Sequence, residues 1–184
     1  GGLRLLQGNL GRAVIKTSAV PETHWEVIAP AIVYERQEDL LNDFEAGRLD
    51  RDFVAVLRRQ GPRANGMPEL HMLTPALSVL QSRGFRVALV TDGRMSGASG
   101  QVPAAIHLWP EAVDSGPILW VCDGDTIHLN AQTGSLQCLV SEDEMLRRRQ
   151  TQSGPPNVCR NSEEESLGRS LFRGIRQQLH NAEE

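Results

Sequence analysis

A strand–helix–strand pattern in the middle of the chain constrains the fold more than any other feature of the sequence. The apolar runs at 53–57 and 87–90 predict two buried strands, at 53–57 and 86–91. Between them, Thr74 as the expected N-cap and Pro75 at the first helical position predict a helix over 74–83. If both strands belong to one sheet, a right-handed crossover makes them parallel, and the loops that follow them emerge at one edge.

The loop after the second of these strands is rich in glycine. Gly93, Gly97 and Gly100 are expected to allow positive φ and a close approach of the backbone to a ligand. Arg94 offers a planar set of donors for a carboxylate or phosphate, and Ser96 places a hydroxyl in the turn. Open α/β sheets bind ligands at this edge. A turn with only local hydrogen bonds is the alternative, because glycine and serine are common turn residues.

A carboxylate is predicted to lie close to that serine. Glu69 is in the loop that follows the first strand, so parallel strands bring it near Ser96. In isolation, a glutamate in a polar loop is normally a solvated side chain. The topology therefore makes Glu69 and Ser96 a candidate pair without assigning their chemistry.

The rest of the chain up to residue 149 is rich in short strand signals and has few helices. Asp123-Gly124 and Thr133-Gly134 are turn signals, so the second half is predicted to contain antiparallel strands. We expect a β-rich α/β fold of mixed strands flanked by helices, either a closed barrel or an open mixed sheet. The further predicted strands are 13–16, 25–28, 31–34, 104–108, 118–122, 126–130 and 135–140, and the further helices are 38–45 and one that begins with a capping box at 141–144.

The composition changes after residue 149. Residues 150–161 are polar, contain Pro155-Pro156 and are predicted to be a linker or loop. Residues 162–184 are predicted to form an amphipathic helix and a tail, with one apolar face made of Leu167, Leu171, Phe172, Ile175 and Leu179. A helix that packs on a domain is favoured over a membrane-surface helix, because this segment is neither notably basic nor aromatic.

Composition and charge exclude several classes of partner. The 184 residues carry a formal net charge of −4 and no basic stripe with interleaved aromatics, so nucleic acid is not expected. No apolar run approaches the roughly 20 residues that a membrane span needs. The scattered Cys122, Cys138 and Cys159 fit neither a disulfide framework nor an iron–sulfur motif and indicate a reducing cytoplasm. Cys122 and Cys138 are expected to be buried in strands, and His107 is expected to be a core histidine.

Several motifs follow one another in a recognisable order. They include NGMPELH at 65–71 and DGRMSGASG at 92–100, within the longer segments 3–16, 60–71, 91–107 and 116–118. Together they resemble the C-terminal part of the dihydroxy-acid dehydratase/phosphogluconate dehydratase family, and the residues of the motifs are most similar to those of the 6-phosphogluconate branch. The resemblance covers nearly all of residues 1–149 and implies a swivelling β/β/α domain with a barrel-like core.

The resemblance also implies roles for residues of the two loops. Glu69 matches the family's Mg²⁺ ligand, and Ser96 matches the serine thought to act as an alkoxide base. A serine hydroxyl needs metal coordination or a strongly cationic site to ionise. Arg94 is expected to position the loop or the substrate, and Asp92 to orient the turn or reach the metal shell. The loop glycines Gly93 and Gly97 are expected to lie against the substrate. Three residues that border the glutamate loop are expected near a substrate phosphate: Arg63, Asn65 and His71.

By the same resemblance, the full-length protein removes water from 6-phosphogluconate to give 2-keto-3-deoxy-6-phosphogluconate in the Entner–Doudoroff route. Family members carry an iron–sulfur cluster, of which the 4Fe–4S type is expected, with the cluster cysteines and remaining Mg²⁺ ligands in a preceding N-terminal domain, and they are commonly dimers. This chain alone is therefore expected to be inactive. The alternatives are a dihydroxy-acid or other sugar-acid dehydratase, and a stand-alone anion-binding or interaction domain without catalysis.

Overall fold

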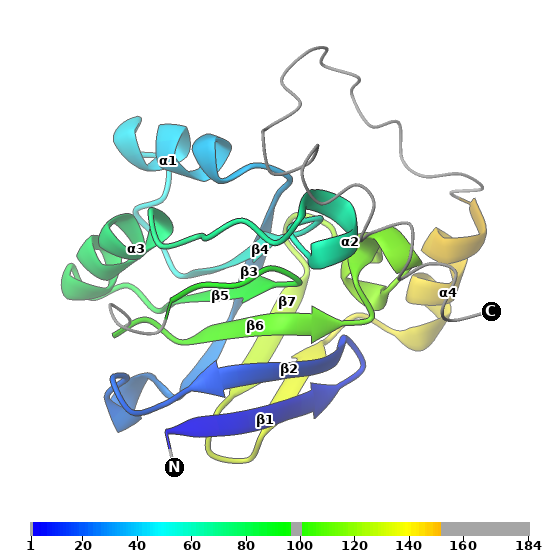
Figure 1. Ribbon diagram of the computed structural model, residues 1–184, viewed down its shortest axis with the longest axis horizontal. Coiled ribbons are helices and arrows are strands. Elements are labelled where there is room, and N and C mark those ends of the chain that lie inside the picture. The colour runs from blue at the N-terminus through cyan, green and yellow to red at the C-terminus, as the bar shows by residue number, and fades with distance from the viewer. Residues whose placement is uncertain (1, 97–100, 152–184) are drawn as a thin grey trace.

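Eight strands close into a barrel in the computed structural model of the protein, which describes residues 2–96 and 101–151 (Figure 1). The strands are β1 (Leu3–Gly8), β2 (Gly11–Lys16), β3 (Glu26–Tyr34), β4 (Phe53–Leu57), β5 (Val87–Thr91), β6 (Ala104–Trp109), β7 (Thr126–Asn130) and β8 (Ser135–Cys138). Their order around the barrel is β1-β2-β6-β5-β4-β3-β7-β8, and β1 closes the ring by pairing with β8. The predicted β-rich α/β class is confirmed, and of the two open alternatives the structure has the closed barrel.

The predicted strand–helix–strand unit is present at the centre of this barrel. β4 and β5 pair in parallel over their whole length, from Phe53 opposite Val87 to Leu57 opposite Thr91. β3 and β6 extend the parallel group on either side. The predicted antiparallel pairing of the second half holds for β7 with β8, whereas β6 runs parallel to β5. The carboxyl ends of four neighbouring strands therefore share one edge.

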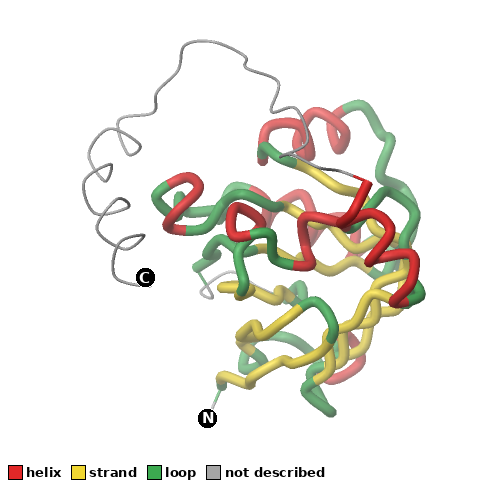
Figure 2. The backbone as a smooth tube through the Cα atoms, turned by 90° about the vertical axis from the view of Figure 1, so that its right-hand side faces the viewer, coloured by secondary structure: helices red, strands yellow, loops and turns green. Residues whose placement is uncertain are grey.

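Two hydrophobic cores lie on the two sides of the barrel wall. Residues 54, 56, 88 and 90 belong to the core that fills the barrel, and residues 53, 55, 57, 87 and 89 belong to an outer core. Both strands are therefore buried on both faces, which explains their continuous apolar sequence. The outer core packs against α1 (Gln37–Glu45) and α3 (Leu73–Ser82), and most helical segments lie above the strands in Figure 2.

The predicted strand at 118–122 is wrong. Residues Pro117–Trp120 form a 3-10 helix, η3, whose Ile118, Leu119 and Trp120 are buried. Arg58 donates hydrogen bonds to the carbonyls of Leu119 at 2.6 Å and Val121 at 3.2 Å. These carbonyls therefore accept from a side chain and not from the backbone of a neighbouring strand. The turn at Asp123-Gly124 therefore leads from η3 into β7 and is not the predicted hairpin, whereas the turn at Thr133-Gly134 does join β7 to β8.

Three further elements differ from the sequence predictions. β1 was missed because its outward leucines are exposed and break the alternating pattern. The two strands predicted around Pro30 are one strand, β3, which pairs with β7 up to Pro30 and with β4 after it. Since proline has no N–H, the change of partner at this residue costs no ladder donor. Thr74 is not the N-cap of α3, because it lies within the helix, buried, with Oγ1 3.5 Å from the sulfur of Met95.

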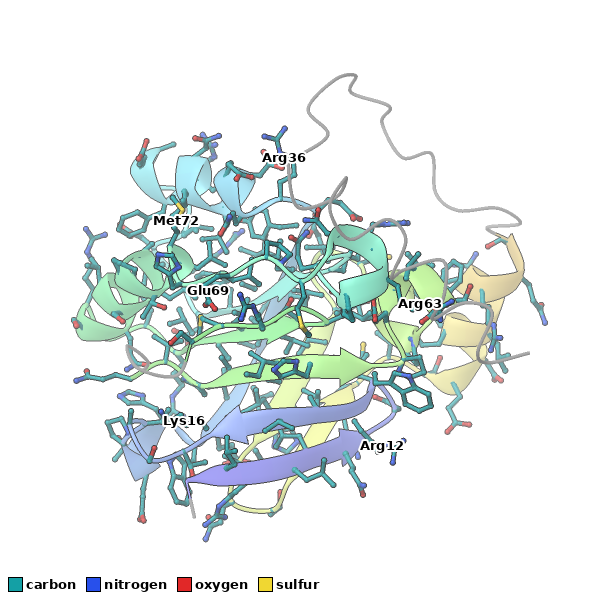
Figure 3. The ribbon with its side chains drawn as sticks, viewed as in Figure 1. Arg12, Lys16, Arg36, Arg63, Glu69 and Met72 are labelled. Atoms are coloured by element: carbon teal, nitrogen blue, oxygen red, sulfur yellow. The ribbon has the colours of Figure 1, made fainter. Side chains whose placement is uncertain are left out.

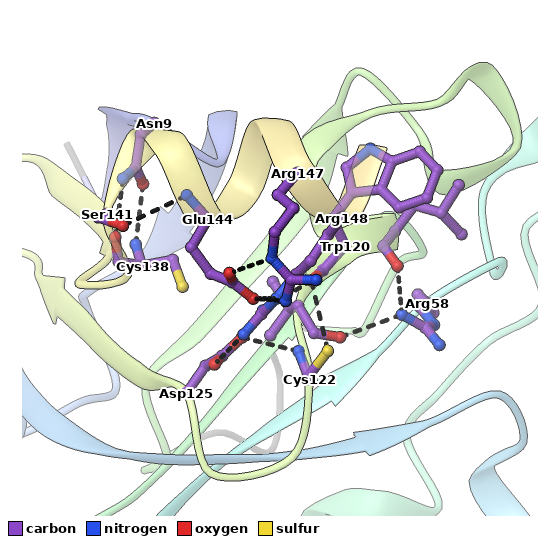
Figure 4. A network of polar contacts seen from close by, with 12 residues as sticks. Asn9, Arg58, Trp120, Cys122, Asp125, Cys138, Ser141, Glu144, Arg147 and Arg148 are labelled. Carbon is purple, nitrogen blue, oxygen red and sulfur yellow. Dashed lines mark hydrogen bonds and ion pairs between the residues drawn. The ribbon is translucent and has the colours of Figure 1, made fainter. Parts of the chain in front are cut away.

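The last described helix, α4 (Glu142–Thr151), packs against η3, and Figure 4 shows the polar contacts that hold it. Ser141 caps its start as predicted, accepting the N–H of Glu144 at 3.3 Å. Arg148 bonds both carboxylate oxygens of Asp125, at 2.6 and 3.1 Å, and the carbonyl of Trp120 at 3.0 Å. α4 thus includes residues 150 and 151, whereas the rest of the predicted linker and the predicted helix at 162–184 lie outside the described residues, and the domain division stays a prediction.

Within the described part of the chain, no helix has the length and apolar character that crossing a membrane requires.

Candidate active site

The loops that carry Glu69 and Ser96 meet at the shared carboxyl edge. The backbone N–H of Ser96 donates to Glu69 Oε1 at 2.6 Å, a short hydrogen bond to a charged acceptor. Beside it, the N–H of Leu70 donates to the carbonyl of Arg94 at 3.2 Å, and residues 69 and 94 form an isolated parallel bridge. The structure therefore brings together the two residues whose proximity the parallel strands predict, and Figure 3 shows Glu69 over the sheet on the viewer's side.

Arg94 places a positive charge next to this carboxylate. Its Nε donates to the carbonyl of Met67 at 3.1 Å and lies 3.8 Å from Glu69 Oε2. About half of the Arg94 side chain is exposed, so solvent screening keeps the strength of this ion pair at about 1 kcal/mol or less. The glutamate loop thus holds the Nε of the guanidinium, while the exposed part of the side chain faces solvent.

The Asp92 carboxylate holds together the loops that follow β4, β5 and β6. The carboxylate is 1% exposed and accepts three backbone N–H groups, from Gln60 at 2.8 Å, Arg59 at 3.1 Å and Ala112 at 3.0 Å. Burial raises the pKa of this carboxyl, and the backbone N–H groups offset part of that rise. These contacts orient the turn after β5 and tie it to the segments after β4 and β6.

Gly93 is required by packing and not by positive φ, so the expected conformation is wrong at this residue. Its φ is not positive, and an added Cβ would lie 2.7 Å from the Cβ of Gln60. Its N–H donates to Thr91 Oγ1 and its carbonyl accepts from His107, each at 2.9 Å. Gly93 therefore lets two loops approach each other, while Gly97 and Gly100 lie outside the described residues.

The residues predicted near a substrate phosphate do not all gather at Glu69. Arg63, on α2 (Pro62–Asn65), forms an ion pair with Asp114 at 2.6 Å and lies well away from Glu69 in Figure 3. Asn65 donates to the side-chain oxygen of Gln60 at 3.1 Å, and His71 is exposed. Contact of these residues with a phosphate stays a prediction.

Sequence reasoning missed a second buried carboxyl group, Glu111. Its Oε2 accepts the N–H of Arg63 at 3.3 Å, and it occupies the space that a side chain at Gly61 would need. Burial is the main cause that raises the pKa of Glu111 to about 7, and the nearby Asp92 and Asp114 raise it further. An acidic residue after Pro110 gives no signal of burial, because glutamate is almost always exposed.

Backbone strain is concentrated at the same edge. Arg59, Met67 and His107 have φ of 63°, 57° and 53°, values that residues with a Cβ seldom adopt. Arg59 follows β4, Met67 precedes Glu69, and His107 interrupts the register of β6 with β2. His107 is exposed there and is not the core histidine predicted from sequence. Strain of this kind is common at functional sites.

The described residues could supply only part of the metal chemistry that the resemblance implies. Glu69 offers one carboxylate, which suits Mg²⁺ because this ion binds few protein carboxylates and keeps several waters. No group of three or more candidate His, Cys, Asp or Glu ligands occurs among the described residues. Cys138 is buried, which raises its thiol pKa, while Cys122 is exposed and not buried as predicted. These two thiols do not fit an iron–sulfur cluster, which needs several thiolates.

Comparison with known proteins decides the family. A family model described as "Dihydroxy-acid/6-phosphogluconate dehydratase C-terminal" matches residues 1–184. The chain belongs to this dehydratase family. Phosphogluconate dehydratases from Escherichia coli (strain K12) and Pseudomonas aeruginosa are 53% and 52% identical over the whole chain. A dihydroxy-acid dehydratase from Ignicoccus hospitalis is 42% identical over 152 residues, or 81% of the chain.

The resemblance stated from the loop motifs is thereby confirmed, including the greater similarity to the phosphogluconate dehydratases. The chain spans 30% of the length of the Escherichia coli relative, 29% of the Pseudomonas aeruginosa relative and 27% of the Ignicoccus hospitalis relative. It therefore matches the C-terminal part of a dehydratase, and the activity of such a longer protein is treated below as a proposal.

Proposed function

We propose that this chain is the C-terminal part of a dehydratase that converts 6-phosphogluconate to 2-keto-3-deoxy-6-phosphogluconate in the Entner–Doudoroff route. The observation that carries the proposal is the contact of Glu69 with the N–H of Ser96 at the carboxyl edge of the parallel strands. The identity of 53% to a phosphogluconate dehydratase over the whole chain supports the choice of substrate.

In the proposed reaction, a base takes the proton from C2 of the acid and the C3 hydroxyl leaves as water. The resulting enol becomes the 2-keto acid. Ser96 is the proposed base, and its hydroxyl needs a cationic surrounding to ionise. Arg94 supports this role, because its guanidinium lies 3.8 Å from Glu69, the residue that accepts the N–H of Ser96, and so places a positive charge beside the serine loop. The same cation suits the substrate carboxylate and the charge that develops on the enolate.

Glu69 is the proposed ligand for Mg²⁺ from this chain. The ion would act as a Lewis acid that helps the hydroxyl leave. Because the described thiols do not fit an iron–sulfur cluster, the cluster, together with the remaining Mg²⁺ ligands, is assigned to the part of the protein that this chain lacks. It follows that the 184-residue chain alone is inactive. We further propose that the full-length enzyme is a cytoplasmic homodimer.

The second candidate is a dihydroxy-acid dehydratase, supported by the 42% identity to a protein of that name. The two functions differ at the tail of the substrate, because a phosphate needs cationic groups and a branched alkyl chain needs an apolar pocket.

The test is an anaerobic assay of the full-length protein with Mg²⁺, on 6-phosphogluconate and on 2,3-dihydroxyisovalerate. Ser96→Ala is compared with Ser82→Ala, a control at an exposed serine whose hydroxyl bonds the carbonyl of Ser78 in its own helix. We expect turnover of the phosphorylated acid, lost in Ser96→Ala and kept in Ser82→Ala. Preference for the branched acid selects the second candidate, and full activity of Ser96→Ala refutes the proposed base.

A further inference from the structure

A glutamate from a distant part of the chain caps the short helix that leads to Glu69. α2 begins after Gly61, which stands at the N-cap position and has no side chain to accept the N–H groups of the first turn. The Glu111 carboxylate fills the space where a side chain at Gly61 would lie. Its Oε2 accepts the N–H of Arg63 at 3.3 Å, and the N–H of Ala64 is a second donor to this carboxyl group. Glu111 therefore takes the place of the missing capping side chain.

The capped helix is joined to the candidate site by a chain of hydrogen bonds. The carbonyl of Gly61 accepts the N–H of Met67 at 3.3 Å, which ties the end of this segment to its start. The carbonyl of Met67 in turn accepts Nε of Arg94 at 3.1 Å. Two residues after Met67, Glu69 Oε1 accepts the N–H of Ser96. A contiguous network of this kind can carry a local change at the start of α2 to the guanidinium and to the candidate pair.

The Glu111 carboxyl group can change its charge inside the fold. It is 6% exposed, and burial is the main cause that raises its pKa to about 7. Asp92, which follows β5, and Asp114, in η2 (Ala112–Asp114), raise this pKa further. The Arg63 guanidinium of α2 is paired with Asp114 at 2.6 Å. The charged neighbours of Glu111 on these three elements are therefore two carboxylates and one arginine that is bound to one of them.

We propose that Glu111 is a positioning residue for the candidate active site, and that its ionised form holds the Arg94 guanidinium in place. A carboxylate is a stronger acceptor for the two N–H groups of α2 than a protonated acid is. Ionisation therefore fixes the start of α2, the carbonyl of Met67 and the arginine that this carbonyl binds. The role of Arg94 in the reaction rests on the proposed function, whereas the contacts that lead from Glu111 to Arg94 do not.

The coupling can be measured in the 184-residue chain without any substrate. The backbone amide resonances of Arg63, Met67 and Ser96 are followed by NMR between pH 5.5 and 8.5, in wild type and in Glu111→Gln. We expect a step with a midpoint near pH 7 at all three amides of the wild type, and no such step in the variant. The amide of Leu146 in α4 is the reference and should show no step with this midpoint.

The comparison of the two proteins identifies the source of each step. Histidine also titrates near neutral pH. His71 and His107 are present in both proteins, so the difference between the two titrations isolates Glu111. A wild type without a step at Ser96 overturns the proposal, whether or not the variant folds. A step that is confined to Arg63, or a step at Ser96 that persists unchanged in Glu111→Gln, also overturns it.

Turnover by the full-length protein then tests whether this coupling acts on the reaction, with whichever of the two acids the protein converts. Glu111→Gln resembles the protonated wild type, so kcat/KM of the two proteins should agree at pH 6. At pH 8.5 the variant should be slower by about fivefold, the factor expected when a charged hydrogen-bond acceptor is replaced by a neutral one. Glu45→Gln, at an exposed position, should match wild type at both pH values.

A ratio of kcat/KM between Glu111→Gln and wild type that is the same at both pH values refutes the positioning role, because a purely structural defect gives such a constant ratio. If neither acid is converted by the wild type, the proposed function fails, and the amide titrations still decide whether Glu111 controls the Arg94 and Ser96 loop.

Discussion

Replacing Glu111 with glutamine should make the stability of the domain less dependent on pH. The pKa of the buried carboxyl is about 7 in the folded chain and about 4.5 in the unfolded chain. Below pH 4.5 the group is protonated in both states. Between pH 4.5 and 7 the unfolded chain releases a proton that the folded chain keeps, so the free energy of unfolding falls as pH rises. A difference of about 2.5 pKa units corresponds to about 3 kcal/mol.

The Glu111→Gln variant keeps the size of the side chain and an acceptor for the N–H of Arg63, while removing the charge. An amide does not titrate in this range, so any loss of packing or hydrogen bonding that it causes changes the free energy of unfolding by the same amount at every pH. The difference in free energy of unfolding between the variant and wild type should therefore change by about 3 kcal/mol between pH 4.5 and pH 8, in favour of the variant at high pH.

Urea unfolding of the 184-residue chain at pH 4.5, 5.5, 6.5, 7.5 and 8 measures this difference. Glu45→Gln, at an exposed position near the end of α1, is the control and should show almost no pH-dependent difference from wild type. A Glu111→Gln difference that stays constant within about 0.5 kcal/mol across the range refutes the reasoning, because the buried carboxyl would then titrate alike in both states.

Three further substitutions test the contacts that hold the site and the barrel end. Asp92→Asn should lower the free energy of unfolding by about 1–3 kcal/mol in urea, because the new NH₂ group leaves at least one of three buried backbone N–H groups unpaired; exposed Asp39→Asn should have almost no effect. Gly93→Ala should cost about 1–3 kcal/mol and shift the amide resonance of Ser96, since its Cβ meets Gln60; an unshifted amide would show that the two loops are independent. Arg148→Met should cost about 2–3 kcal/mol and speed hydrogen exchange in 142–151, because it leaves buried Asp125 without its cation; Arg147→Met, at an exposed arginine, should change neither quantity.

The central part of the fold could be predicted because its sequence signals are local and agree with one another. β4 and residues 87–90 of β5 are continuously apolar, which is typical of strands buried on both faces. The helix between them has a proline, Pro75, in its first turn and ends before Gly84. Once those elements are fixed, the handedness of the crossover leaves one arrangement for the two loops. The proximity of Glu69 and Ser96 is thus a consequence of topology, independent of the family.

The elements that sequence reasoning missed depend on contacts with distant parts of the chain. Residues 118–121 are apolar because they are buried, and a buried 3-10 helix has the same apolar composition as a buried strand. Arg58, some sixty residues away, bonds the carbonyls of Leu119 and Val121, a contact with no local sequence signal. β1 has exposed leucines at positions 3 and 5 on its outward face, so its sequence lacks the alternation of apolar and polar residues that marks a strand with one solvated face. Glu111 gives no local sign of burial, since the space for it is made by the missing side chain of Gly61.

The two buried carboxyl groups explain how a candidate site on loops keeps its geometry. Asp92 holds the N–H groups of Arg59 and Gln60, and Glu111 holds that of Arg63, so the segment that leads to Glu69 is fixed at three residues. Neither carboxyl group touches Glu69 or Ser96 in the hydrogen bonds of the described residues. Since removing a buried acceptor costs about 1–3 kcal/mol for each N–H left unpaired, this anchoring is strong enough to hold strained residues such as Arg59 in place. The Glu69 carboxylate is therefore positioned by contacts among the described residues, from the buried carboxyl groups through the loop backbone to the N–H of Ser96.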